Sequence, residues 1–470
     1  MSLTVRVQDI VDQEIDPLLA IDPSWARVPL GAIAQILNGF AFPSKNFRKE
    51  GGTPLIRIRD VSADRTVCTY AGDFDPRYAI SPGDLLVGMD GDFKCAAWKG
   101  PMALLNQRVC KIAVTRADYS ERFLALALPG YLNAIRRHTS SVTVSHLSSR
   151  DIAEIPLPFP PLAEQKRIVA KVEGLLASVN AARERLARVP AILKRFRQAA
   201  LEAACQGKLT EDWRDTQQPG LSAAILLSEI GAARQEVESE SGRRHRQPTL
   251  PDADTLPCLS PGWVAATVSQ LAWLDQGFAF KSSEFVERGI RLLRGENVAP
   301  GALRWDDIRY WPTDRAPEFE KLVVEAGEII LALDRPIVSA GLKLAQTKPE
   351  DVPCLLVQRV MRFRPVEPSL SAFLYLCLQT DRFQHHLAGG MTGSDLPHVT
   401  GTTVADFTVP LPALLEQREI VRRVRTLLRL ADTVENRVAD ASACAERLTQ
   451  AILAKAFHGE LVSLEVVQTS

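Results

Sequence analysis

The chain has 470 residues, enough for two or three domains of ordinary size. Hydrophobic residues make up 46% and charged residues 24%, which is typical of a globular protein with sizeable cores. The 56 basic and 56 acidic residues cancel, which excludes a strongly basic nucleic-acid binder, so any DNA-binding role has to rest on local charge.

The first 24 residues form an N-terminal segment that lacks the features of an export signal. Acidic residues stand where a signal peptide needs a basic start and an apolar run. No stretch reaches about 18 apolar residues, so no transmembrane helix is predicted. The eight cysteines are scattered, without CxxC pairs or a metal-type spacing with histidine. We expect a cytoplasmic protein with reduced thiols, no metal site and no membrane association.

Residues 25–156 begin an internal repeat of about half the chain, and residues 263–410 form its second copy. The first copy opens with WARVPLGAIAQILNGFAF and the second with WVAATVSQLAWLDQGFAF. Three more pairs of blocks recur in the same order: LIRIRDV and LLRGENV, PGDLLVGMDG and AGEIILALDR, LLNQRV and LLVQRV. Small gaps separate the blocks, as expected when strands are kept and loops vary.

Both copies are predicted to be globular heads of mixed α/β structure. Short apolar or β-branched runs bounded by turn residues predict strands at 55–58, 84–87 and 108–114. Residues 120–135 and 369–384 are expected to be helical. In each GFAF, the glycine predicts a close backbone approach, and the phenylalanine pair is expected to fill a core, with base stacking as the alternative. Basic residues outnumber acidic ones in the first head only, so charge gives less support for DNA binding by the second head.

A helical region follows each head, at 157–210 and at 411–470. The two copies match without a gap from Glu164 to Gly207 and, 252 residues later, from Glu416 to Gly459. One inserted residue would rotate every later side chain of a helix off its face, so a gap-free match predicts a rigid helical rod. The two glycines are expected at the helix C-caps.

Apolar residues in both rods follow a heptad spacing, which predicts a coiled-coil seam. We expect the rods to pack antiparallel within one chain, because the repeat supplies both partners. A rod of about 27 residues spans about 40 Å, slightly more than one turn of B-DNA, so the pair could act as a ruler between the heads. Pro190 is expected to break the first rod and start a shorter helix at 191–205. The seam residues are Ile168, Val172, Leu175, Val179, Leu186, Ile420, Val424, Leu427, Val434 and Val438.

Residues 211–262 form a polar linker with a helix-like stretch at 222–240. Its basic cluster at 243–246 is expected to be a solvated loop that could touch phosphate. No catalytic constellation stands out, because there is neither a phosphate-binding GxxxxGK[ST] loop nor a glycine-rich cofactor turn. His146 and His398 hold matching places in the repeat and are expected to be hydrogen-bonding residues. Paired carboxylates such as Asp90 and Asp92 are common in turns and carry little weight as metal ligands.

Two heads, each closing on an IPLPP-x-x-EQ-like segment and followed by a heptad rod that ends G-[KE]-L, resemble the specificity subunits of type I restriction–modification systems. The stretches concerned are IPLPFPPLAEQKRIV…QGKLT and VPLPALLEQREIV…HGELV, and GKLTEDWR also fits. The resemblance covers nearly the whole chain, although the second copy, PLPALLEQ, lacks the additional proline pair of PLPFPPLAEQ. It implies two tandem target recognition domains of mixed α/β (α+β) structure, separated by an antiparallel pair of long coiled-coil helices in a pseudo-two-fold internal repeat.

The resemblance also implies that each head reads one half of a split target in double-stranded DNA. The helices would dock two methyltransferase subunits, which bind S-adenosylmethionine, and separate restriction motor–nuclease subunits would bind ATP, so that this non-catalytic chain would bind no cofactor. Two loops per head are expected in the major groove: one after the G-[DE] strand, at 90–99 and 334–343, and one at 139–146 and 392–398. The candidate DNA-binding residues are Lys94, Lys99, Arg108, Ser145, His146, Arg335, Lys343, Arg359, Ser394 and His398, each with an ordinary solvated role as the alternative.

Two other functions stay open on the sequence alone. A coiled-coil scaffold with paired protein-binding heads is compatible with the neutral net charge. A stand-alone DNA methyltransferase or nuclease is disfavoured by the missing cofactor and phosphate loops. Specific duplex binding that weakens steeply with salt would distinguish a DNA reader from a scaffold.

Overall fold

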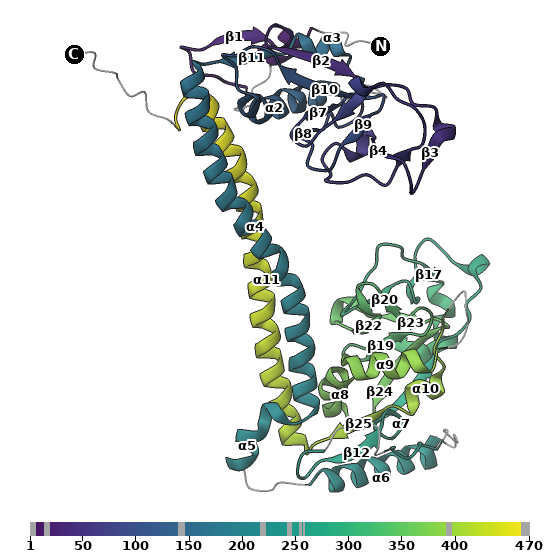
Figure 1. The fold of residues 1–470 in the computed structure, drawn as a ribbon. Helices are drawn as coiled ribbons and strands as arrows, with labels where there is room; N and C mark the ends of the chain where they lie inside the picture. Colours follow the sequence, from purple (N-terminus) through teal and green to yellow (C-terminus); the bar gives the residue numbers. More distant parts are fainter. Residues whose placement is uncertain are drawn as a thin grey trace. The chain divides into compact units, whose positions relative to one another are not determined.

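The computed structural model describes residues 6–13, 19–139, 146–216, 222–241, 247–252, 256, 259–391 and 397–461 (Figure 1). The chain forms two compact units: Met1–Ala187 with Val438–Ser470, and Arg188–Arg437. Each unit contains one head and a part of both long helices. Ser145, Ser394 and the basic cluster at 243–246 lie outside the described residues. Of the helices that are described, none is both long enough and apolar enough to cross a membrane.

The first head is built on two sheets that share no strand. A four-stranded sheet has the order β2-β10-β7-β8, and a five-stranded one the order β3-β5-β4-β9-β6, in which only β4 and β9 run parallel. A separate antiparallel pair, β1 with β11, closes the head. Its strands are β1 (Ala26–Pro29), β2 (Ala34–Asn38), β3 (Phe47–Arg48), β4 (Thr53–Ile56), β5 (Thr69–Tyr70), β6 (Ala79–Ile80), β7 (Leu85–Gly88), β8 (Cys95–Ala97), β9 (Ala103–Leu105), β10 (Val109–Val114) and β11 (Pro156–Phe159).

The second head repeats this topology, except that its second sheet has four strands where that of the first head has five. Its main sheet has the order β13-β24-β19-β22, its second sheet the order β17-β14-β23-β18 with β14 parallel to β23, and β12 pairs with β25. Two small hairpins, β15-β16 and β20-β21, are additions. The strands are β12 (Val264–Thr267), β13 (Ala272–Gln276), β14 (Ile290–Leu293), β15 (Val298–Ala299), β16 (Ala302–Leu303), β17 (Tyr310–Trp311), β18 (Val323–Val324), β19 (Ile329–Ala332), β20 (Ile337–Val338), β21 (Gly341–Leu342), β22 (Leu344–Gln346), β23 (Cys354–Leu356), β24 (Val360–Pro365) and β25 (Thr408–Leu411).

The helices comprise two of 44 residues each and nine shorter ones within the described ranges. The expected helix at 369–384 is divided in two, because Thr380 caps the second part through its side-chain hydroxyl. The helices are α1 (Val7–Gln13), α2 (Glu121–Thr139), α3 (Ser149–Ala153), α4 (Leu162–Cys205), α5 (Glu211–Thr216), α6 (Ala223–Ser241), α7 (Val268–Leu271), α8 (Ser371–Leu378), α9 (Asp381–Gly389), α10 (Gly401–Ala405) and α11 (Leu414–Phe457).

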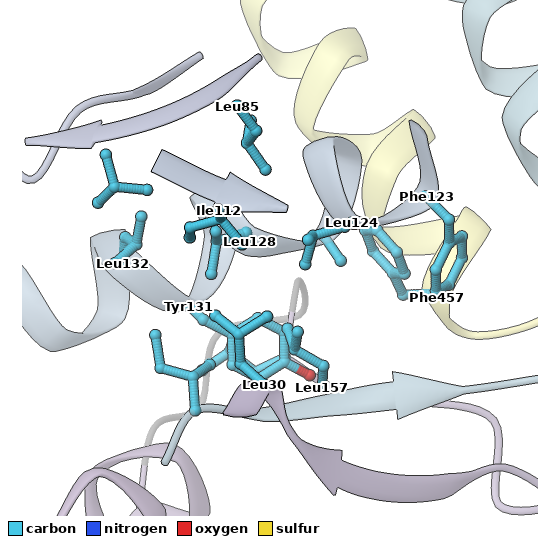
Figure 2. Packing of buried hydrophobic residues seen from close by; sticks show 14 of the residues in the cluster. Leu30, Leu85, Ile112, Phe123, Leu124, Leu128, Tyr131, Leu132, Leu157 and Phe457 are labelled. Carbon is cyan, nitrogen blue, oxygen red and sulfur yellow. The ribbon is translucent and has the colours of Figure 1, made fainter. Parts of the chain in front are cut away.

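The core of the first unit joins residues from opposite ends of the sequence. Figure 2 shows Phe123 of α2 against Phe457 of α11, with ring centroids 5.7 Å apart in an edge-to-face arrangement. Both rings are nearly fully buried. The backbone amide of Asp22 also donates to the carbonyl of Phe457 at 3.0 Å. The end of α11 is therefore a structural part of the first head.

The helices α4 and α11 pack on each other in both units, as the heptad spacing predicts, and run side by side in Figure 1. In the first unit, Arg183 lies 3.4 Å from Glu446. In the second, Arg197 lies 2.7 Å from both Asp432 and Glu435. The partner number falls as the α4 number rises, so the pair is antiparallel, as expected. The fold prediction of a mixed α/β repeat with paired long helices is thus confirmed.

The seam residues differ in how deeply they are buried. Ile168, Val172, Val179, Ile420 and Val424 are buried, and the other five are half-buried: Leu175, Leu186, Leu427, Val434 and Val438. Half of the seam residues are therefore fully enclosed, and the other half keep part of their side-chain surface in contact with solvent.

The expected break at Pro190 is wrong, because α4 continues through it without interruption. A proline inside a helix removes one backbone hydrogen bond and costs about 3 kcal/mol. Val179 before it and Leu193 after it are both buried, so packing on either side holds the helical path. The expected C-cap glycines are found, since Gly207 and Gly459 have φ angles of 70° and 73°.

Candidate nucleic-acid interface

Three backbone hydrogen bonds bring separate loops together at one end of the main sheet of the first head. The amide of Met89, just after β7, donates to the carbonyl of Arg108 at 2.9 Å, and Leu147 donates to Met89 at 2.8 Å. The amide of Gln107 donates to the carbonyl of Phe40 at 2.8 Å. Sequence blocks that are far apart in the chain thus lie next to one another.

The second head reproduces this arrangement bond for bond. The amide of Leu333 donates to Arg359 at 2.8 Å, and Val399 donates to Leu333 at 2.9 Å. Gln358 donates to the carbonyl of Phe278 at 2.8 Å. The blocks that recur in the sequence are therefore those that build this end of the sheet. We call these two places the sheet-end clusters.

In the first cluster, a carboxylate holds an arginine and a histidine. Asp90 pairs with the guanidinium of Arg108, and Nδ1 of His146 lies 2.5 Å from the other carboxylate oxygen. Burial alone would raise the pKa of Asp90, but the hydrogen bonds from Arg108 and His146 outweigh it and hold the pKa below its usual value. The Arg108 side chain is 60% exposed. Asp90 therefore holds one edge of its guanidinium, and the other edge faces solvent.

The second cluster contains the equivalent residues in a looser form. Arg359 lies 3.6 Å from Asp334, and both side chains are about half exposed. Asp334 forms an isolated antiparallel bridge with His398, as Asp90 does with His146 in the first head. An arginine, an aspartate and a histidine therefore meet at the same place in both heads.

Both arginines have a backbone conformation that L-residues rarely adopt. Arg108 has a φ of 72° and Arg359 a φ of 66°. Each stands third in a four-residue turn closed by a hydrogen bond, from Val109 to Asn106 at 3.3 Å in the first head. Glycine is the residue that takes this position without strain, and a side chain there costs about 1–3 kcal/mol. Two arginines at the same strained position point to a role for the side chain rather than for the turn.

The predicted lysines and the remaining arginine are distributed unevenly. Lys94 is exposed, and its carbonyl accepts from Gly88 at the cluster end of β7. Arg335 follows Asp334 directly, and the carbonyl of Lys343 accepts from Ala332 at 3.0 Å, so both belong to the second cluster. Lys99 lies at the opposite end of the β7–β8 hairpin, since its neighbour Trp98 donates to Asp84.

Lys343 differs from the other candidate cations because it is half-buried. Burial lowers the pKa of its ammonium group, while the nearby carboxylates of Glu296 and Asp334 act in the opposite direction. His146 and Arg108 lie together in the first cluster, and Arg359 and His398 lie together in the second. The expected loops contain the two histidines but neither arginine, so the sequence did not predict that these residues would meet.

The glycine of each GFAF does allow a close backbone approach, as predicted. A Cβ on Gly39 would lie 2.1 Å from the carbonyl oxygen of Asn106, and one on Gly277 would lie 2.3 Å from Val357. The expectation that both phenylalanines fill a core is wrong for the first of each pair. Phe42 is buried, whereas Phe40 is 44% exposed. Phe40 lies beyond the end of β2, and its backbone carbonyl accepts from Gln107 in the neighbouring turn.

Sequence reasoning missed the two aspartates and the two exposed phenylalanines. On the sequence, Asp90 carries little weight as a metal ligand and Asp334 is only the first residue of an expected loop, although each aspartate pairs with the arginine of its cluster. The signal for them was present, since all four residues hold equivalent positions in the repeat. The described residues contain no group of three or more metal-ligating side chains.

Comparison with known proteins supports one family. The family model for the type I restriction modification DNA specificity domain matches residues 23–190 and 314–440. The chain is 35% identical to the EcoBI specificity subunit of Escherichia coli, over 98% of this chain and 92% of that protein. It is 25% identical to the EcoKI specificity subunit of E. coli strain K12, over 93% of this chain and 89% of that protein.

The fold has a counterpart among solved structures. One chain in a structure that describes the assembly and conformational transition of the type I R-M system matches with a TM-score of 0.59. The match covers 94% of this chain and 99% of that chain, at 21% sequence identity. The family model and the EcoBI relative both cover more of the chain than either head alone. The chain therefore belongs to the family of type I restriction–modification specificity subunits.

Proposed function

We propose that each head reads one half of a two-part DNA target through its sheet-end cluster. The observation that carries this proposal is the recurrence of an arginine, an aspartate and a histidine in the same arrangement in both heads. The arginines occupy strained turn positions, which folding alone does not favour.

The chemistry of the cluster suits the major groove. A guanidinium carries five N–H donors in a rigid fork, and it pairs in a bidentate manner with the N7 and O6 acceptors of guanine. The carboxylate of Asp90 or Asp334 fixes one side of that fork, so less conformational freedom is lost when the other side meets a base. The exposed Lys94 and Arg335 are proposed to contact phosphates beside the same groove.

The two heads differ in charge, and this difference bears on the role of phosphate contacts. The first head has more basic than acidic residues, and the second has slightly more acidic ones. We infer that the first head contributes more of the salt-dependent, sequence-independent attraction to DNA. The second would then depend more on base contacts.

Specificity subunits determine which DNA a type I restriction–modification complex recognises and have no catalytic role, while their partner subunits use S-adenosylmethionine and ATP. This family membership sets aside both the scaffold and the stand-alone enzyme. A chain that reads cellular DNA in a bacterial complex is proposed to work in the cytoplasm.

We propose that α4 and α11 dock the two methyltransferase subunits. Large apolar side chains on these helices face solvent, where a partner would cover them. The exposed fractions are 52% for Ile192, 58% for Leu415, 57% for Leu430 and 48% for Leu448.

Leu430→Ser tests this docking surface. We expect retention of the methyltransferase subunits to fall by roughly tenfold or more, because a fully buried leucine contributes about 1.5–3 kcal/mol. Thermal stability of the isolated chain should change little, since surface substitutions stay within about 0.5 kcal/mol. The matched control is Leu250→Ser, which removes a leucine that is 85% exposed in the linker. Equal retention in both variants would contradict docking at Leu430.

Exchange of a whole head tests the division of the target into halves. Residues 25–156 would be replaced by the equivalent head of another member of the family, and the modified sequence read from the methylation of genomic DNA. We expect one half of the target to change and the other half to stay, because each head contains its own cluster.

The reciprocal exchange, of residues 263–410, should change the other half. The helical regions at 157–210 and 411–470, the linker at 211–262 and the N-terminal segment at 1–24 stay unaltered in both chimaeras. If one exchange altered both halves of the target, the proposal of one half-site per head would be wrong.

A further inference from the structure

The first phenylalanine of each GFAF is an exposed apolar side chain on a rigid support. Phe40 is 44% exposed and Phe278 is 48% exposed, whereas their neighbours Phe42 and Phe280 are buried. An apolar ring in water gains nothing for folding, so its presence at the same place in both heads calls for a partner outside the chain.

Each exposed ring is held by other aromatic rings. Phe40 lies 5.1 Å from Phe42, edge to face, and 5.2 Å from Tyr78. Phe278 lies 5.3 Å from Phe280, and a further ring, Phe319, lies 5.1 Å from it. These contacts fix the ring before any ligand arrives, which lowers the entropy lost on binding.

The rings belong to the sheet-end clusters. The carbonyl of Phe40 accepts the amide of Gln107, and Arg108 is the next residue. The carbonyl of Phe278 accepts the amide of Gln358, which precedes Arg359. Gln107 and Gln358 are both exposed. Each head therefore places a phenylalanine, a glutamine and an arginine side by side at one edge.

These three side chains match the groups that the major groove presents. Arginine pairs with guanine, glutamine pairs with adenine, and an apolar side chain such as phenylalanine contacts the C5-methyl group of thymine. In the minor groove the same apolar ring would act as a wedge between base pairs, but the glutamine and arginine would find a much poorer code there.

We propose that Phe40 and Phe278 each contact the C5-methyl group of a thymine, one in each half of the target. The inference rests on the proposed function of the clusters and adds a specificity-determining residue to each. It requires that both halves of the target contain a thymine whose methyl group contributes to binding.

Deoxyuridine differs from thymidine only by this methyl group and so isolates the contact. In the complete complex with its methyltransferase subunits, binding would be measured to duplexes in which each thymine of the target, as read from the methylation of genomic DNA, is replaced in turn. We expect one position in each half to lose about fourfold in affinity, the effect of one buried methyl group. In Phe40→Ala the thymine-to-deoxyuridine ratio should fall to about one in the first head's half only. Phe278→Ala should do the same in the other half.

The ratio compares two duplexes on one protein, so it does not depend on how stable the variant is. Phe40→Leu keeps an apolar side chain and should retain part of the discrimination. Met102→Ala is the control, because Met102 is 46% exposed in the same head at the other end of β9. Unchanged discrimination in Phe40→Ala, or no position sensitive to the methyl group, would overturn the proposal. If Arg108→Gly still weakened binding in that case, the cluster itself would stand.

Discussion

Replacing both turn arginines by glycine, as Arg108→Gly with Arg359→Gly, is expected to weaken specific duplex binding by at least about thirtyfold. Each bidentate arginine–guanine pair contributes about 1–3 kcal/mol, so two independent pairs contribute about 2–6 kcal/mol. Folding should not suffer. Glycine relieves the strain at φ angles of 72° and 66°, and this offsets the roughly 0.4–1 kcal/mol by which glycine favours the unfolded chain. Fluorescence anisotropy with a labelled target and a thermal melt measure the two effects separately.

Two arginines at the opposite ends of the same strands provide matched controls. Arg116 follows β10 and Arg364 lies near the end of β24, and both pair with carboxylates, Asp118 and Asp275. Replacing them by alanine removes the same charge and should lower affinity less than threefold. A large fall in melting temperature with unchanged affinity in the double glycine variant would instead assign the turn arginines to folding.

Glu416→Ala is expected to destabilise the second unit by about 3–5 kcal/mol, the cost of removing one partner of a buried ion pair. Glu416 is 5% exposed at the start of α11. One carboxylate oxygen accepts from Thr210 at 2.7 Å and from the guanidinium of Arg214, and the other accepts from the indole of Trp263 at 2.9 Å. All three donors would lose this carboxylate at once, and only Arg214 and Thr210 have a further acceptor, the carbonyl of Gly207.

Urea unfolding followed by tryptophan fluorescence measures this loss, since Trp263 itself is one of the donors. The control is Glu446→Ala on the same helix, whose carboxylate pairs with Arg183 at 3.4 Å but is 70% exposed. An exposed pair contributes no more than about 1 kcal/mol, so this variant should unfold almost as the parent does. A similarly small shift for Glu416→Ala would show that water replaces the carboxylate.

Internal repetition made much of the architecture predictable. Blocks that recur with gaps turned out to be strands and strand ends, as with LLNQRV and LLVQRV, and the gap-free stretch became α4 and α11. The match of Glu164 with Glu416 established which residues of the two long helices are equivalent. Repetition also pointed to His146 and His398, because residues that recur outside a core require an explanation other than packing.

The remaining features depend on distances that a sequence does not contain. Lys94 and Lys99 are five residues apart, yet the β7–β8 register places only the first near Asp90. Pro190 follows the local rule for breaking a helix, but packing along α4 outweighs it. Phe40 and Phe42 have the same side chain and contact the same aromatic rings, yet only Phe42 is buried, and Phe40 stays 44% exposed. The ruler role of the helices stays a prediction, which a four-residue insertion into each helix would test.

The contact between Phe123 and Phe457 has a consequence for how the protein is made. A ribosome releases the first head early, but the ring that completes its core emerges only after all of Arg188–Arg437 has been synthesised. At about 5–20 residues per second, that interval lasts roughly ten seconds to a minute. Once Arg437 has been added, and before Phe457 is reached, the second unit, which is contiguous in sequence, has every residue it needs to fold. The head that is translated first is therefore the last to be finished.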